Sequence, residues 1–477
     1  MEFSFDDFKN GMTGFVPPKA FVPYVGIDPR KYQEYKEEDT PKSLAEALEE
    51  IEKRVDHKYH RKLIPLAQFS ISYAADVFPA FDLFYSEMIA DDWLSMVGWQ
   101  KFQRDHLVHQ PLTAYTVYKM LRGWNGKEPF KIGKKTLLQH CVDAVLFNEE
   151  SYYLREYLVK WNTQKIHGKQ PYDFFLLKQK GLLVNQEDKI LTVNDEKRFA
   201  HPLYRLWELL FTETAYVAAM FHDIGYPWQY VQRLSKSLPH TKNAVALHYD
   251  GKDITTENFR HRLLYVVLNG YQSKGPGQPI PWDHVVEKGI DEGFRKTHGL
   301  PGAFTFLLLN DVLRDFPQEK NHTWFLRQFV IEWAAVAICM HDLMKVYRGE
   351  KKDGQERNGD VCPGRPSLQV SFAKDPLSAV LCLADFMQDF ERHSAIFDKS
   401  GKKPTLSFER KCHEVSLEMD YDVAKIVFYH ENASAKKEKQ HFIRKEKDDF
   451  FSPSTGYLDF SACGIAKFDI SAEVRKA

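Results

Sequence analysis

The chain has 477 residues, of which 43% are hydrophobic, 14% aromatic and 27% charged. This composition is typical of an ordinary globular protein with an aromatic-rich core, and the length allows two or three domains or one large elaborated domain. The formal net charge is −1, so nothing in the overall balance favours a polyanionic partner such as duplex DNA, although a local basic patch stays open.

The cysteines and the N-terminus predict where the chain works. The six cysteines are scattered and none forms a Cys-x-x-Cys pair, which favours reduced, buried thiols. The first residues, MEFSFDDFKNG, are partly acidic and lack the apolar core of a signal peptide. The most apolar stretch, residues 329–340, is too short to span a bilayer and contains Glu332. We therefore expect a cytoplasmic protein without a membrane partner.

The first four-fifths of the chain predict helices. Residues 1–40 are rich in Pro, Gly and aromatics and suggest an irregular arm. Apolar periodicity and helix propensity dominate thereafter, and the cluster of Gly, Pro and polar residues at 237–282 indicates a long insertion. The predicted helices cover residues 43–55, 104–123, 135–161, 202–223, 298–316, 323–349 and 375–393. Gly123 is expected to end one helix, and Pro202 and Pro376 to begin two others.

The pattern changes after residue 400. Alternating apolar residues predict strands, a highly charged stretch predicts a helix, and together they suggest a small α+β appendage. The strands are expected at 405–410, 413–419, 424–430, 457–462 and 466–474, and the helix at 436–449. Its basic residues are most simply a solvated helix face. The expected division is an N-terminal arm with helical elaboration at 1–100, a helical domain at 101–395, and the appendage at 396–477.

Two His-Asp pairs, in FHDIGYPW (221–228) and MHDLMKVY (340–347), follow apolar helical runs. Neutral imidazoles and carboxylates are ligands that Zn, Mn and Fe take, and an adjacent His-Asp pair can serve one ion or bridge two. The surroundings of the two pairs differ, which argues against a duplicated domain. The candidate ligands, in chain order, are His106, His109, His222, Asp223, His298, His341, Asp342 and Asp385.

This order resembles the HD superfamily of metal-dependent phosphohydrolases, which has a His on one helix, a later His-Asp pair and a closing Asp. HDIG (222–225) is similar to one form of the pair, HLVHQ (106–110) to the first helix, and LADFMQDF (383–390) to the last. HGLPGAF (298–304) and MHD (340–342) resemble the additional elements of members with two or more metals, such as the HD-GYP phosphodiesterases. The resemblance implies a mainly α HD-domain helical bundle with an insertion at about 229–297.

The chain also departs from the HD-GYP pattern. The gap between His222 and His298 is 76 residues, and a single His-Asp replaces the family's His-His-Glu in the late element. The GYP letters at 225–227 directly follow the first pair and are not the family's GYP motif. These departures argue against a cyclic dinucleotide substrate and leave the metal core untouched.

The resemblance implies roles for individual residues. One or two divalent ions, with Mn, Fe, Zn, Mg and Ni as candidates, would be held by six ligands. These implied ligands are His109, His222, Asp223, His298, His341 and Asp385. Asp223 would also act in catalysis by bridging ions. His106 could donate a proton or be a surface histidine, and Asp105 or Asp342 could orient the imidazoles.

Four further residues are candidates for substrate binding. Lys345 lies one helical turn after His341, where it could act in catalysis and bind phosphate or simply extend to solvent. Arg295 and Lys296 have the same two readings. Tyr226 could stack on a nucleobase or pack in the core.

Three functions are compatible with these residues. The first is hydrolysis of (deoxy)nucleoside triphosphates, the second is a phosphodiesterase for cyclic mono- or dinucleotides, and the third is a non-catalytic nucleotide sensor. A nuclease is disfavoured because the composition shows no broad basic surface. We expect a nucleotide substrate, a homo-oligomer and a nucleotide or protein regulator, in a setting such as pool control, signalling or antiviral defence.

Overall fold

The computed structural model describes residues 1–13, 15–18, 69–70, 73, 106–147, 195–200, 202–226, 297–314, 330–331, 333–342, 370–398, 405–410, 412–451 and 456–475. Of these residues 58% are helical and 20% lie in strands, which confirms the prediction of a mainly α protein. The predicted helix at 43–55 lies outside the described residues, as does nearly all of the insertion at 229–297.

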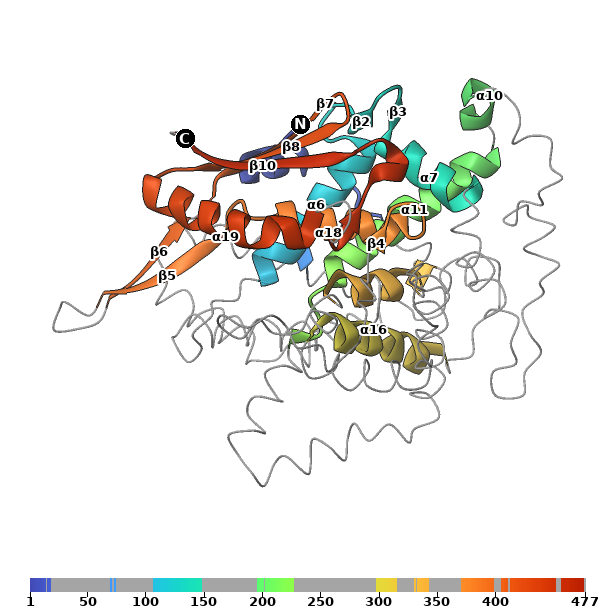
Figure 1. Ribbon diagram of the computed structural model, residues 1–477. Coiled ribbons are helices and arrows are strands. Elements are labelled where there is room, and N and C mark those ends of the chain that lie inside the picture. The colour runs from blue at the N-terminus through green and yellow to red at the C-terminus, as the bar shows by residue number, and fades with distance from the viewer. Residues whose placement is uncertain are drawn as a thin grey trace, which may run out of the picture.

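The helical part centres on helix α11 (Pro202–Phe221), which packs on α6 (His106–Arg122), α7 (Leu137–Phe147) and α18 (Pro376–Met387). Most apolar side chains along α11 are almost fully buried, Leu209 being exposed, so this helix forms the middle of the core. Figure 1 shows α6, α11 and α18 beside one another beneath the sheet, with α16 (Gly299–Arg314) further below.

Local signals account for where these helices begin and end. Asp375 caps α18 by accepting a hydrogen bond from the Ser378 backbone N–H at 3.1 Å, and Pro376 follows as the first helical residue, as predicted. Gly123 ends α6 with a φ of +82°, a conformation that favours glycine. In contrast, α18 stops at Met387 rather than at the predicted residue 393, because the chain there turns into a strand.

Short elements connect these helices. A hairpin links α6 to α7, and a six-residue helix precedes α11. Of two further strand pairs, the parallel one joins distant parts of the chain and the antiparallel one joins segments close in sequence. The bounds are β2 (Lys131–Ile132), β3 (Lys135–Thr136), α10 (Asp195–Ala200), β4 (Val370–Ser371) with β9 (Leu458–Asp459), and β5 (His393–Asp398) with β6 (Thr405–Arg410).

Three strands near the C-terminus and one at the N-terminus form a four-stranded sheet in the order β1-β7-β8-β10, with antiparallel pairs except for the parallel β8–β10 pair. The bounds are β1 (Glu2–Ser4), β7 (Glu414–Asp420), β8 (Val423–His430) and β10 (Lys467–Val474). Helix α19 (Ala433–Phe451) supplies the crossover that a parallel pair requires and packs on β8 and β10 (Figure 1).

The start of the chain corrects one expectation. Residues 2–11 form β1 and α1 (Phe5–Gly11), not the beginning of an irregular arm. The reason is burial, because Phe3, Phe5 and Phe8 are all in the core. The N-terminal segment therefore completes the sheet that β7, β8 and β10 build.

The C-terminal unit, which consists of β7, β8, α19 and β10, packs directly on the helical part. The Phe386 ring, on α18, contacts the rings of Phe428 and Phe451. Lys439 of α19 forms an ion pair with Asp389 at 3.2 Å, just beyond the end of α18. The C-terminal unit therefore packs against the last turn of α18.

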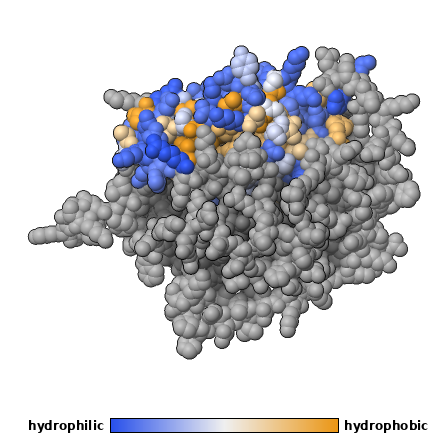
Figure 2. All heavy atoms as spheres, viewed as in Figure 1, coloured by the Kyte–Doolittle hydropathy of each residue, from blue (hydrophilic) through white to orange (hydrophobic). Residues whose placement is uncertain are grey.

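Surface and cysteine properties complete the description. Within the described ranges, no helix combines the length and apolar character needed to cross a membrane. In the view of Figure 2, hydrophilic residues predominate on the coloured surface, with hydrophobic ones interspersed. The described cysteines are all buried and form no disulfide, as the sequence predicted. They are Cys141, Cys339, Cys382, Cys412 and Cys463.

Candidate metal centre

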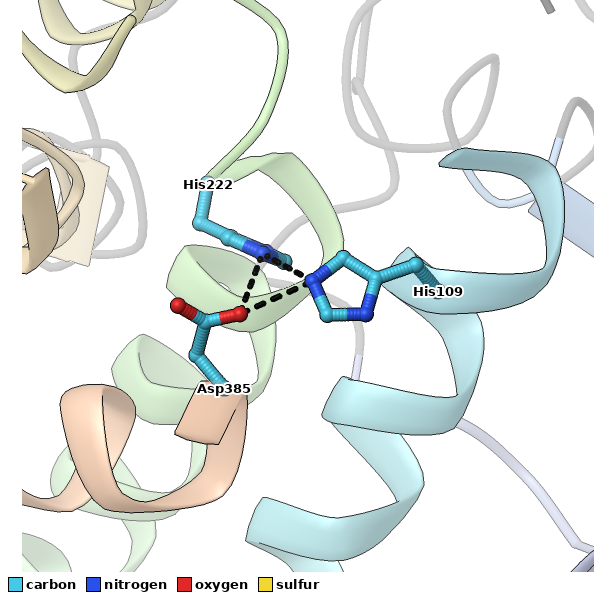
Figure 3. Close-up of side chains that lie close together, drawn as sticks. All are labelled: His109, His222 and Asp385. Atoms are coloured by element: carbon cyan, nitrogen blue, oxygen red, sulfur yellow. Dashed lines mark hydrogen bonds and ion pairs between the residues drawn. The ribbon is translucent and has the colours of Figure 1, made fainter. Parts of the chain in front are cut away.

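Three helices bring His109, His222 and Asp385 together (Figure 3). His109 lies in the first turn of α6, His222 follows the last residue of α11, and Asp385 lies in the last turn of α18. The Nε2 atom of His109 is 2.8 Å from Oδ1 of Asp385 and 3.1 Å from Nε2 of His222. Nε2 of His222 is 3.5 Å from the same carboxylate oxygen. Their facing atoms could hold one metal ion.

A second group lies beside the first. His298 immediately precedes α16, and His341 lies near the end of a helical segment at 330–342. Their Nε2 atoms are 2.9 Å apart, and they lie 2.9 Å and 3.7 Å from Oδ1 of Asp223. All three side chains are buried.

Asp223 joins the two groups because each of its oxygens faces a different pair of histidines. Oδ1 faces His298 and His341, whereas Oδ2 lies 3.6 Å from Nε2 of His109 and 3.4 Å from Nε2 of His222. This is the arrangement by which one carboxylate can bridge two ions. The resulting centre has four imidazoles and two carboxylates from five separate segments of the chain.

The other ring nitrogens of two histidines are held by the backbone. Nδ1 of His222 lies 2.7 Å from the Ala219 carbonyl oxygen, and Nδ1 of His341 lies 2.6 Å from that of Ile338. A carbonyl only accepts, so each Nδ1 must donate its proton. Both rings therefore present an Nε2 lone pair to the centre unless they are doubly protonated.

Side chains hold the remaining two histidines. Gln388 donates from its amide nitrogen to the Phe390 carbonyl at 2.9 Å, so its amide oxygen faces and accepts from Nδ1 of His109. Nδ1 of His298 lies 2.7 Å from Oδ2 of Asp342. Three imidazoles are thus fixed by hydrogen bonds in the tautomer that suits a metal ligand through Nε2, and the fourth, His298, has the Asp342 carboxylate in ion-pair contact with its Nδ1.

The electrostatics of the cluster call for a cation at its centre. Burial lowers the pKa of His222, but the carboxylates of Asp223 and Asp385 outweigh it and raise that pKa to about 9. Burial raises the pKa of Asp223, but His222, His298 and His341 outweigh it and hold that pKa well below its usual range. The cluster therefore keeps positive charge next to its carboxylates, as protons or as a metal ion.

The donor atoms fit a metal ion for a further geometric reason. Two pairs of Nε2 atoms approach to 3.1 Å and 2.9 Å, and when both rings of a pair are neutral and protonated on Nδ1 their lone pairs face each other. Lone pairs at this separation repel unless a cation lies between or beside them. A divalent ion bound by both nitrogens of a pair would remove this repulsion.

Glycines allow the backbone segments of the centre to approach closely. A Cβ atom on Gly225, in the HDIG turn, would lie 1.9 Å from the His298 carbonyl oxygen. A Cβ atom on Gly299 would lie 2.7 Å from the Ile338 carbonyl oxygen. The turn after α11, the start of α16 and the segment 330–342 can therefore meet only without side chains at these positions.

The structure brings together all six side chains predicted as metal ligands, and it places Asp342 behind His298. Tyr226 stacks on the His298 ring with centroids 3.9 Å apart and an interplanar angle of 14°. His106 is the first residue of α6. Asp105, Arg295, Lys296 and Lys345 lie outside the described residues.

Sequence reasoning missed Gln388, the partner of His109. Gln388 lies in the LADFMQDF stretch, three residues after Asp385, but nothing in that sequence distinguishes it from a solvent-exposed glutamine. The backbone acceptors of His222 and His341 have no side-chain signal at all, although both lie three residues before the histidine that they hold.

No protein-family model, curated protein sequence or solved structure matches the chain. The geometry and chemistry of the centre are therefore the basis for its functional assignment.

Proposed function

We propose that the protein is an HD-type metal-dependent phosphohydrolase that acts on nucleotides. The observation that carries this proposal is the position of Asp223, with one oxygen toward His109 and His222 and the other toward His298 and His341. Two ions held this way match the arrangement that enzymes use for in-line displacement at phosphorus.

The residues of the centre have separate roles in the proposed reaction. Divalent ions, when bound, supply a Lewis acid that activates water near neutral pH and neutralises charge on phosphoryl oxygens. Asp223 would hold an ion with each of its oxygens, and Asp385 would add a second carboxylate to the group of His109 and His222. The hydrogen bonds at Nδ1 of His109, His222 and His341, with the Asp342 carboxylate beside Nδ1 of His298, hold the imidazoles in place before substrate arrives, which limits reorganisation during the reaction.

Other residues are proposed to meet the substrate. His106 lies one helical turn before His109, and we propose that it protonates the leaving oxygen, since an imidazole titrates near neutrality. Tyr226 is half-buried, and the face of its ring opposite His298 is proposed to receive a nucleobase. Arg295, Lys296 and Lys345 are the proposed phosphate-binding cations.

The substrate proposed first is a (deoxy)nucleoside triphosphate. The second candidate, a cyclic nucleotide phosphodiesterase, is favoured by the position of His298 and His341 beside the bridging carboxylate, which supports a centre with two ions. A non-catalytic nucleotide sensor remains the third candidate. We further propose a cytoplasmic homo-oligomer whose C-terminal unit receives a nucleotide or protein regulator.

A product screen tests these candidates. The purified protein is incubated with Mn²⁺ and pools of dNTPs, NTPs and cyclic nucleotides, beside Asp223→Ala and a control, Asp420→Ala, at an exposed turn of the sheet. Release of phosphate or triphosphate by wild type and control alone supports the first candidate. Linear nucleotides from cyclic ones support the second. Binding of a nucleotide without turnover supports the sensor, and turnover that survives in Asp223→Ala contradicts both enzymatic candidates.

A further inference from the structure

The two His-Asp pairs place their aspartates in different positions. Asp223 faces the Nε2 atoms at the middle of the centre. Asp342 is equally buried, but its Oδ2 atom accepts from the backbone N–H of His298 at 2.8 Å and lies 2.7 Å from Nδ1 of the same residue. The second pair therefore supplies one proposed ligand, His341, and one residue that holds another ligand.

His298 differs from the other three histidines in the nature of this partner. Nδ1 of His222 and Nδ1 of His341 face backbone carbonyls, and that of His109 faces the neutral amide of Gln388. Only the Nδ1 of His298, among the four, faces a carboxylate. A carboxylate this close favours a proton on Nδ1 and increases the electron density on the opposite ring nitrogen more than a neutral group does.

Asp342 also fixes the position of the backbone that carries His298. It belongs to the segment 330–342, and its bond to the His298 backbone N–H ties the start of α16 to that segment. The segment also carries His341, whose Nε2 is 2.9 Å from that of His298. One side chain thus sets both the ring orientation of His298 and its separation from His341.

We propose that Asp342 is a positioning residue that controls binding of the second ion, the one facing His298 and His341, and leaves the first largely unaffected. This inference rests on the proposed metal centre. Asp342 contacts His298 through both its backbone N–H and its ring, and His298 faces the second ion, whereas His109 and Asp385 belong to the first group. Loss of its charge should therefore separate the two binding steps.

The test is titration of the metal-free protein with Mn²⁺, followed by calorimetry and by electron paramagnetic resonance. Asp342→Asn keeps an oxygen that can accept the hydrogen bond from the His298 backbone N–H but removes the charge beside Nδ1, and Asp342→Ala removes both the oxygen and the charge. We expect two binding steps in wild type. In Asp342→Asn the second step should weaken by roughly 10- to 100-fold, with loss of the exchange-coupled signal of an ion pair, and Asp342→Ala should show a single step.

Asp375→Asn is the matched control. Asp375 is also buried, but it caps α18, where Asn serves equally well, so both steps should persist. Two unchanged steps in Asp342→Asn, or equal weakening of both, would overturn the role of Asp342 while leaving the proposed function standing. A wild type that binds no Mn²⁺ would overturn the metal centre itself.

A measurement on the unaltered chain covers the case in which neither variant folds. In zinc-loaded protein with ¹⁵N-labelled histidine, the Nδ1 proton of one ligand should resonate apart from the other three, because the group nearest to it is a carboxylate. Four similar resonances would contradict the proposal.

Discussion

Gln388→Ala removes the amide that orients His109. The change deletes the oxygen that accepts from Nδ1 of His109 and the N–H group that donates to the Phe390 carbonyl at 2.9 Å. The imidazole is only 3% exposed, so water cannot easily take the place of the amide. A buried donor without a partner costs about 1–3 kcal/mol. Because each 1.4 kcal/mol is about tenfold in affinity, the first ion should bind roughly 5- to 140-fold more weakly.

The assay is a calorimetric Mn²⁺ titration of wild type, Gln388→Ala and a control, Gln139→Ala. Gln139 accepts a 2.9 Å hydrogen bond from the Thr136 backbone N–H at the start of α7, so its loss removes a comparable bond away from the centre. Both variants should retain the helical circular dichroism of wild type. Unchanged affinity for the first ion in folded Gln388→Ala would refute the reasoning that this amide positions His109.

Three further outcomes are expected. Asp7→Asn leaves a buried ammonium unpaired and should destabilise the protein by about 3–5 kcal/mol, measured by chemical unfolding, whereas exposed Asp6→Asn should not. Burial raises the pKa of Asp7, but its hydrogen-bonded partners lower that pKa by more, so the pKa in the native state lies below the pKa in the unfolded state. The ionised Asp7 therefore stabilises the protein at neutral pH, and this stabilisation is lost as the pH falls below about 4. A difference in stability between wild type and Asp7→Asn that stayed the same in acid would contradict the assignment. Gly225→Ala should lower the melting temperature more than Gly302→Ala, because the added Cβ would meet backbone atoms at 1.9 Å rather than 3.1 Å; equal effects would count against the close approach. The pKa of His222 is about 9 without metal, so protons compete with Mn²⁺ below that pH, and the Mn²⁺ affinity should rise with pH up to about 9. Calorimetry in buffers of different ionisation enthalpy should show that protons are released when Mn²⁺ binds, and binding without proton release would refute the competition.

Local sequence signals predicted several elements closely. Helix α11 begins at Pro202 and α18 follows the Asp375 cap, because capping and proline geometry act within a few residues. Strand β6 covers the predicted residues 405–410. In contrast, the pairing of residues 2–4 with 414–416 connects the two ends of the chain, and neither strand carries a sign of its distant partner.

The same distinction applies to the site. The proposed ligands could be named from residue type and order, because imidazole and carboxylate chemistry is visible in the sequence. Their assignment to two groups could not, since it depends on which oxygen of Asp223 faces which histidine. The roles of Gln388 and the carbonyls of Ala219 and Ile338 also arise only when helices pack, because a backbone acceptor is the same in every residue.

The central claim is that Asp223 lies between two metal ions. The most direct measurement is anomalous diffraction from crystals of the full chain grown with Mn²⁺. We expect two peaks about 3.5–4 Å apart, one toward His109, His222 and Asp385 and the other toward His298 and His341. Crystals with no peak beside Asp223, or with manganese bound only elsewhere, would contradict the account.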